Sequence, residues 1–187
     1  VRGQFRGYTK EPGVAPDSKI ETFAAVKLHV DNWRWQDVPF YIRAGKNLPV
    51  TCTEVLVRLK RPPKIFPTCT APANHLRFRV SPDVVIALGT TVMDLSERNI
   101  GRQIELTMSH HPGADEPEAY ERVLTDAMEG DQTLFARQDY VEEAWRIVDP
   151  VLAAGTPLYP YDSGQWGPDE AQKLAPKDGW DDPVVTP

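Results

Sequence analysis

Period-two alternation between apolar and polar residues constrains the fold of this chain more than any other feature. Ala24, Val26, Leu28 and Val30 share one side of the first such segment. The candidate strands with this alternation cover residues 21–30, 38–43, 54–60, 75–81 and 103–108. Residues 84–93, which are almost all apolar or small, form a further candidate strand. The alternation is typical of antiparallel sheets that pack one face and leave the other more polar.

A change to helical spacing follows the last of these segments. Asp115 and Glu118 form a candidate capping box around Pro117, and apolar residues then recur at helical intervals until Gly130. Tyr120 is expected to anchor this helix in the core.

A second helix is expected to begin near Asp139 and to place Trp145 in the core. Pro150 is expected to limit it, because proline lacks the backbone N–H that a helix interior needs. Proline supplies 18 of the 187 residues, about twice its usual share of about 5%. This proline content excludes long uninterrupted helices over much of the chain.

A run of strands followed by helices is typical of an α+β protein. We predict a large, mostly antiparallel β-sheet with helices packed on one face, in a single domain spanning residues 1–187. Residues 1–20 are expected to form a loop that leads into the sheet. Residues 158–187 are expected to form a tail rich in proline and aromatic residues, with one short helix after Pro168. Because the chain begins at Val1 rather than at a methionine, we expect it to be the rear part of a longer protein.

The charge balance excludes several classes of partner. The chain has 21 Lys and Arg against 27 Asp and Glu, a net charge of −6, so nucleic acid and anionic membranes are poor partners. No run approaches the roughly 18 apolar residues of a membrane span, and no targeting segment is recognisable. Cys52 and Cys69 are expected to be free thiols, and the protein to be cytoplasmic.

One short cluster is chemically suggestive. A predicted strand delivers Arg43, Gly45 allows a tight turn, and Lys46 follows. Two cations at a strand end are able to hold a phosphate dianion. A Gly-Lys turn is more often ordinary solvated surface, so from the residues alone both interpretations remain open.

Other polar groups favour structural roles. Arg77 and Arg79 share one strand face and are expected to lie opposite acidic groups on a neighbouring strand. The adjacent His110 and His111 are expected to be polar residues at a strand end, and no metal site is predicted. The alternative is a metal enzyme or hydrolase that uses these histidines with Asp115 or Glu116. Neither a GxGxxG nor a Walker A sequence is present.

Several blocks in colinear order resemble glucose-6-phosphate dehydrogenases. They are Arg2–Phe5, Thr22–Val26, Val38–Lys46, Glu116–Leu124, Gly130–Phe135, Glu143–Ile147 and Gly164–Pro168. The resemblance covers essentially the whole chain and is to the C-terminal domain of that family. It implies a mostly antiparallel sheet with helices, in which the sheet forms the subunit interface of dimers or tetramers. It also implies that an NADP-binding Rossmann domain, with the catalytic histidine and aspartate, belongs to an N-terminal half that this sequence lacks.

The resemblance also assigns individual residues. Lys46 matches a lysine that contacts the substrate, D-glucose 6-phosphate. Arg43 and Arg79 match arginines that bind a second, structural NADP in animal enzymes. The sequence departs from that pattern at three positions, Thr51, Cys52 and Ser81, where animal enzymes have other ligand-binding residues. Lys46 is therefore the best supported substrate residue.

The activity implied by the resemblance is the oxidation of D-glucose 6-phosphate to 6-phosphogluconolactone with reduction of NADP, the first oxidative step of the pentose phosphate pathway. This chain would supply one wall of the sugar phosphate site and hold a homo-oligomer together. By itself it is expected to be inactive, because the catalytic residues lie elsewhere. The alternative is a non-catalytic α+β module that mediates self-association only.

Overall fold

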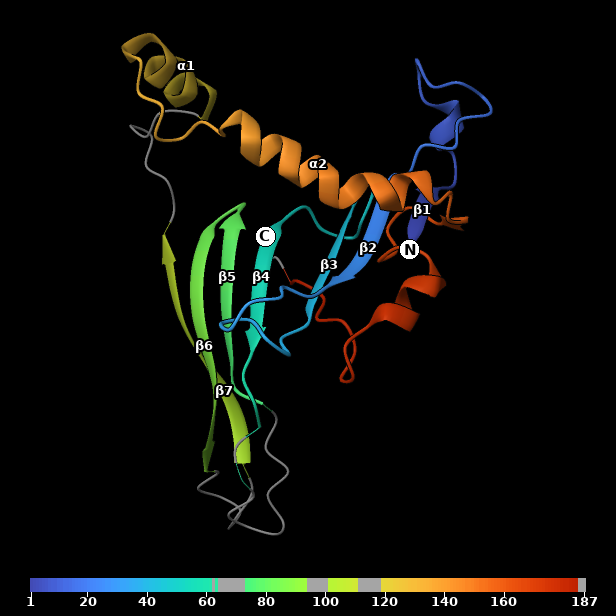
Figure 1. Ribbon diagram of the computed structural model, residues 1–187. Coiled ribbons are helices and arrows are strands. Elements are labelled where there is room, and N and C mark those ends of the chain that lie inside the picture. Colours follow the sequence, from blue (N-terminus) through green and yellow to red (C-terminus); the bar gives the residue numbers. More distant parts are fainter. Residues whose placement is uncertain (62, 64–72, 94–100, 111–118, 185–187) are drawn as a thin grey trace. The chain divides into compact units, whose positions relative to one another are not determined.

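The computed structural model describes residues 1–61, 63, 73–93, 101–110 and 119–184. The chain divides into two compact units, and each contains one four-stranded sheet (Figure 1). The first unit comprises Val1–Pro49 with Ala114–Trp180, and the second comprises Val50–Gly113 with Asp181–Pro187. The single domain expected from the sequence stays a prediction.

The sheet of the first unit has the strand order β3-β2-β1-β8. Neighbouring strands are antiparallel except β1 and β8, which run parallel. The strands are β1 (Arg2–Phe5), β2 (Phe23–Leu28), β3 (Phe40–Gly45) and β8 (Leu158–Tyr161). This arrangement joins the start of the chain to the first residues of the tail, because β8 pairs with β1.

The sheet of the second unit is an antiparallel meander with the order β4-β5-β6-β7. Its strands are β4 (Thr53–Arg58), β5 (His75–Ser81), β6 (Val84–Met93) and β7 (Gly101–His110). All six candidate segments, five with alternation and one almost entirely apolar or small, contain a strand, and the α+β class with mostly antiparallel strands is confirmed. The described strands form two sheets instead of a single large one.

The loop expected for residues 1–20 contains two regular elements, β1 and the 3₁₀ helix η1 (Tyr8–Lys10). Both are too short to produce a recognisable period, and β1 depends on its neighbours β2 and β8 for hydrogen bonds. In the tail, the helix expected after Pro168 is the 3₁₀ helix η2 (Asp169–Leu174).

Both predicted helices are present, as α1 (Ala119–Glu129) and α2 (Gln138–Ala153). Pro150 lies inside α2, which continues for three more residues, so the expectation that it ends the helix was wrong. The Ala154 N–H donates to the Pro150 carbonyl at 3.1 Å, which shows that the last turn still closes after the proline. The candidate capping residues Asp115 and Glu118 lie outside the described residues.

The expected core positions of Tyr120 and Trp145 were also wrong. Their side chains are 84% and 52% exposed, and every residue of α2 is exposed. Helical spacing predicts which residues share a face, but it does not show what covers that face. No helix among the described residues is long and apolar enough to cross a membrane.

The core of the first unit is small and aromatic. Five buried side chains form it: Phe5, Phe23, Ala25, Tyr161 and Ala171. Phe23 and Tyr161 are 1% and 2% exposed, and their ring centroids lie 5.7 Å apart. This core lies directly beneath the turn that follows β3, because Phe23 pairs with Gly45 in the sheet.

Candidate functional site

The exposed lysine predicted to bind substrate follows the last residue of β3. The Lys46 backbone is held on both sides: its N–H donates to the Thr22 carbonyl at 2.8 Å, and its carbonyl accepts from the Tyr161 hydroxyl at 2.7 Å. Its side chain is exposed and makes no hydrogen bond or ion pair within the part of the chain that the structure describes. The turn therefore presents a mobile ammonium group from a fixed backbone.

The residues on either side of Lys46 explain why the chain turns there. A Cβ on Gly45 would lie 2.8 Å from the Phe23 ring and 3.2 Å from the Thr22 carbonyl, so only glycine fits against the core. Asn47 has a φ of 53°, a left-handed conformation that asparagine tolerates better than most residues. The Asn47 carbonyl accepts a hydrogen bond from the Gly164 N–H at 2.8 Å, which ties the turn to the tail.

The buried hydroxyl of Tyr161 is a feature beside the candidate site that sequence reasoning missed. Besides Lys46, it lies 3.0 Å from Thr22 Oγ1 and 3.2 Å from the Thr22 carbonyl. Burial raises the pKa of Tyr161, and the hydrogen bond with Thr22 opposes this only in part. The phenol therefore stays protonated near neutral pH and remains a hydrogen-bond donor. Periodicity places Tyr161 in the tail but gives no sign of its partners.

Arg43 lies on β3, the strand that precedes Lys46, and two aromatic rings of the tail pack near it. Its guanidinium carbon is 4.4 Å from the ring centroid of Trp166 and 5.1 Å from that of Trp180. Cation–π contacts of this kind stabilise the guanidinium in place. Trp166 of the tail therefore packs against the guanidinium of Arg43 on β3.

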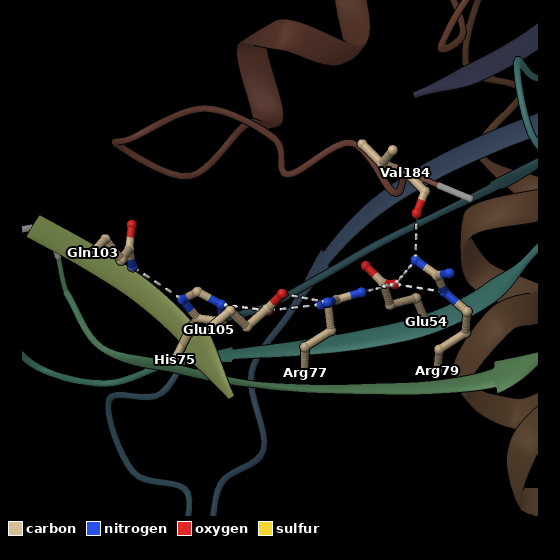
Figure 2. Close-up of polar contacts among 7 residues, drawn as sticks. All are labelled: Glu54, His75, Arg77, Arg79, Gln103, Glu105 and Val184. Atoms are coloured by element: carbon tan, nitrogen blue, oxygen red, sulfur yellow. Dashed lines mark hydrogen bonds and ion pairs between the residues drawn. The ribbon is translucent and has the colours of Figure 1, made fainter. Parts of the chain in front are cut away.

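Arg79 lies in the other unit, in a row of charged and polar side chains on one face of its sheet (Figure 2). We call this row the charge ladder; its members are Glu54, His75, Arg77, Arg79 and Glu105. Its Nε and Nη2 donate to Glu54 at 3.0 and 2.8 Å, and Nη2 also contacts the Val184 carbonyl at 2.7 Å. Arg79 and the Glu54 side chain are 7% and 9% exposed. These contacts account for the burial of Arg79 without a bound nucleotide. Its role at a second NADP site stays a prediction, as does that of Arg43.

The same ladder continues along β5 to β7. Arg77 Nε donates to Glu105 at 2.9 Å and its Nη1 lies 3.6 Å from Glu54, while His75 Nε2 lies 3.2 Å from Glu105 (Figure 2). The contacts with Glu54 confirm that Arg77 and Arg79 lie opposite an acidic group on the neighbouring strand β4, while Glu105 lies two strands away on β7.

Small residues on the intervening strand β6 allow the side chains of Arg77 and His75 on β5 to contact Glu105 on β7. A Cβ on Gly89 would lie 2.0 Å from the His75 ring, so the ring lies flat against the sheet only because that position is glycine.

The pKa of Glu105 is lowered, first by its hydrogen bond with Arg77 and then by that with His75, while burial opposes the shift. The charges on this face therefore satisfy one another, and the ladder is a structural feature of the sheet.

The opposite face of the same sheet is apolar and exposed. Alternate residues on all four strands contribute to it, among them Val55 (54% exposed), Phe78 (38%), Ile86 (44%), Leu106 (58%) and Met108 (69%). An exposed apolar patch that spans a whole sheet marks an interaction surface. We call this set of side chains the apolar face of the second sheet.

Among the described residues, no three histidine, cysteine or acidic side chains are grouped as metal ligands require. His111, Asp115, Glu116 and Cys69 lie outside the described residues. Cys52 is half-buried.

These features define an α+β protein with two mostly antiparallel sheets, an exposed lysine on a rigid turn and one uncovered sheet face. The family model for "Glucose-6-phosphate dehydrogenase, C-terminal domain" matches residues 1–181. The chain belongs to this family.

Two curated relatives are named glucose-6-phosphate 1-dehydrogenase. The protein from Treponema pallidum is 43% identical over 198 residues, covering 93% of this chain and 37% of the relative. A protein from Mycobacterium tuberculosis is 42% identical over 188 residues, covering 98% of this chain and 40% of the relative. The chain therefore spans about two fifths of the length of these relatives.

Two solved structures have a similar fold. The glucose-6-phosphate 1-dehydrogenase of Mycobacterium avium is 39% identical, with a TM-score of 0.89 over 100% of this chain and 41% of that protein. A glucose-6-phosphate dehydrogenase in complex with its substrate glucose-6-phosphate is 27% identical, with a TM-score of 0.79 over 98% of this chain and 40% of that protein.

Proposed function

We propose that this chain is the C-terminal part of an NADP-dependent glucose-6-phosphate dehydrogenase of the cytoplasm, in which Lys46 binds the phosphate group of D-glucose 6-phosphate. The observation that carries this proposal is the exposed Lys46 ammonium on a turn whose backbone is fixed on both sides. Membership of the family and a related structure in complex with glucose-6-phosphate support it.

Lys46 acts in binding and orientation. A lysine ammonium supplies three N–H donors and a full positive charge to a phosphate. Because the phosphate is remote from the reacting carbon, this binding energy serves to orient that carbon toward the nicotinamide. When bound, NADP accepts the hydride; the catalytic histidine and aspartate implied by the resemblance belong to the N-terminal half.

The test is Lys46→Ala in the full-length enzyme that carries this chain. We expect KM for glucose 6-phosphate to rise about 10- to 150-fold, or about 1.5–3 kcal/mol, the range for a hydrogen bond to a charged group. Lys10→Ala, which removes an exposed lysine from η1, is the matched control and should leave KM unchanged. An unchanged KM in Lys46→Ala would show that Lys46 is not at the substrate.

We propose a second role, homo-oligomerisation through the second sheet. The apolar face of that sheet supports it, because the charge ladder on the other face is internally satisfied and offers few groups to a partner. A module that only self-associates would share this surface but would not need Lys46. The isolated 187-residue chain is expected not to reduce NADP whether it is part of a substrate site or a module that only self-associates. The effect of Lys46→Ala on KM therefore separates these two possibilities.

A further inference from the structure

We propose that Tyr161 is a positioning residue for sugar phosphate binding, and that its hydroxyl group fixes the backbone from which the Lys46 side chain extends. This inference rests on the proposed role of Lys46 and adds a buried residue of the tail that does not itself touch substrate. It concerns only the first unit, which contains all the groups involved.

The hydrogen bonds around the Tyr161 hydroxyl form a series with one direction. The Phe5 N–H donates to Thr22 Oγ1 at 2.9 Å, Thr22 Oγ1 lies 3.0 Å from Tyr161 Oη, and Tyr161 Oη donates to the Lys46 carbonyl at 2.7 Å. Because the single Tyr161 proton is donated to the Lys46 carbonyl, the Thr22 hydroxyl donates its own proton to the Tyr161 oxygen. Every donor in the series then has an acceptor, which links β1 in the core to the turn at Lys46.

The burial of the series makes each member difficult to replace. Tyr161 is 2% exposed and Thr22 is 7% exposed, so water has little access to a group that loses its partner. The Lys46 carbonyl is the end of the series, while the Lys46 side chain lies in solvent. The Tyr161 hydroxyl therefore links the rigid core to the Lys46 backbone, from which the exposed side chain extends.

A fixed Lys46 backbone favours substrate binding rather than the chemical step. The lysine side chain has four rotatable methylene groups, and binding must restrict both these and any backbone motion beneath them. A backbone that is already fixed reduces the freedom lost when the ammonium meets the phosphate. Loss of the Tyr161 hydroxyl should therefore raise KM for the sugar phosphate and leave kcat largely unchanged.

The experiment is steady-state kinetics of Tyr161→Phe in the full-length enzyme. We expect KM for glucose 6-phosphate to rise about 3- to 10-fold, with kcat within about twofold of the original enzyme. Tyr159→Phe is the matched control, because Tyr159 is half-buried on the same strand and its hydroxyl has no polar contact within the described residues. It should leave both constants unchanged.

A double variant separates positioning from general damage. If Tyr161 acts through Lys46, then Tyr161→Phe should add nothing to the KM of Lys46→Ala. If its effect multiplies with that of Lys46→Ala, the hydroxyl acts by another route and the proposal is overturned.

A second pair of variants covers the case in which Tyr161→Phe does not fold. Thr22→Val removes the hydroxyl that precedes Tyr161 in the series, and Thr22→Ser keeps it. We expect the valine variant to raise KM and the serine variant to restore it. Equal KM values for the two would overturn the proposal.

The outcomes also distinguish this inference from the proposed function. If Lys46→Ala raises KM and Tyr161→Phe does not, the positioning role fails and the function stands. If Lys46→Ala itself leaves KM unchanged, the proposed function fails first.

Discussion

Two glycines of the tail differ in what surrounds them, although both have positive φ angles. Gly167 has a φ of 94°, and a Cβ there would lie 2.4 Å from the ring of Phe23, which is 1% exposed. Gly164 has a φ of 82°, and a Cβ there would have no atom within 4 Å. Gly167 is therefore constrained by both backbone conformation and packing, and Gly164 by conformation alone.

We expect Gly167→Ala to lower the free energy of unfolding by about 2–4 kcal/mol, because left-handed strain adds to overpacking of the core. Gly164→Ala should cost only about 1 kcal/mol, the strain of the conformation. Urea unfolding of both variants measures the difference. Equal losses would mean that Phe23 moves aside at little cost.

The residues of the candidate site were predictable to different degrees. Gly45 and Lys46 stand out in the sequence because a glycine followed by a lysine after a strand is a recognisable turn, and the resemblance assigned the lysine its role. Tyr161 and Thr22 were not predictable. Their hydrogen bonds join positions 139 residues apart, and no local pattern reports a contact at that separation.

At the scale of the element, the charge ladder makes the stability of the second sheet depend on pH. The pKa of Glu105 is lower in the folded protein than its ordinary value near 4.5, chiefly because Arg77 donates to it. The unfolded chain therefore binds more protons than the folded one at acidic pH. The stabilisation is complete above about pH 4.5 and is lost as the pH falls through the folded-state pKa.

We expect Glu105→Gln to lower the free energy of unfolding by less than about 1 kcal/mol at neutral pH, since the side chain is about one third exposed. The variant should also lose less stability than the original protein when the pH falls below about 4.5. Glu143→Gln is the control: Arg146 also lowers the pKa of Glu143, but the pair lies on the surface of α2 in full solvent, where screening leaves it little effect on stability, so this variant should keep the pH profile of the original protein. Parallel pH profiles for Glu105→Gln and the original protein would contradict the assignment.

The elements themselves were predictable where the chain repeats a pattern for long enough. Five strands and two helices follow from periodicity, because each has a face that repeats several times, and β6 follows from a continuous stretch of apolar and small residues. Strands β1 and β8 have four residues each and are defined by pairing, β1 with β2 and β8, and β8 with β1. Pro150 shows the limit of a local rule, since a helix of 16 residues tolerates one interruption close to its end.

At the scale of the whole molecule, the contrast between the two faces of the second sheet predicts self-association. Leu106 and Thr107 are adjacent on β7, so their side chains point to opposite faces. Leu106 belongs to the apolar face and Thr107 lies on the side of the charge ladder, next to Glu105 in the alternation. The pair offers a matched test in which the same charge is added to either face of one strand.

We expect Leu106→Lys to weaken oligomerisation of the full-length enzyme, because association would bury an unpaired ammonium among apolar side chains. Thr107→Lys should leave the oligomeric state unchanged. Sedimentation velocity over a range of protein concentrations measures both variants against the original enzyme, with circular dichroism to show that each is folded. Dissociation of Thr107→Lys with an intact Leu106→Lys oligomer would place the interface on the charged face, and no effect of either would remove this sheet from the interface.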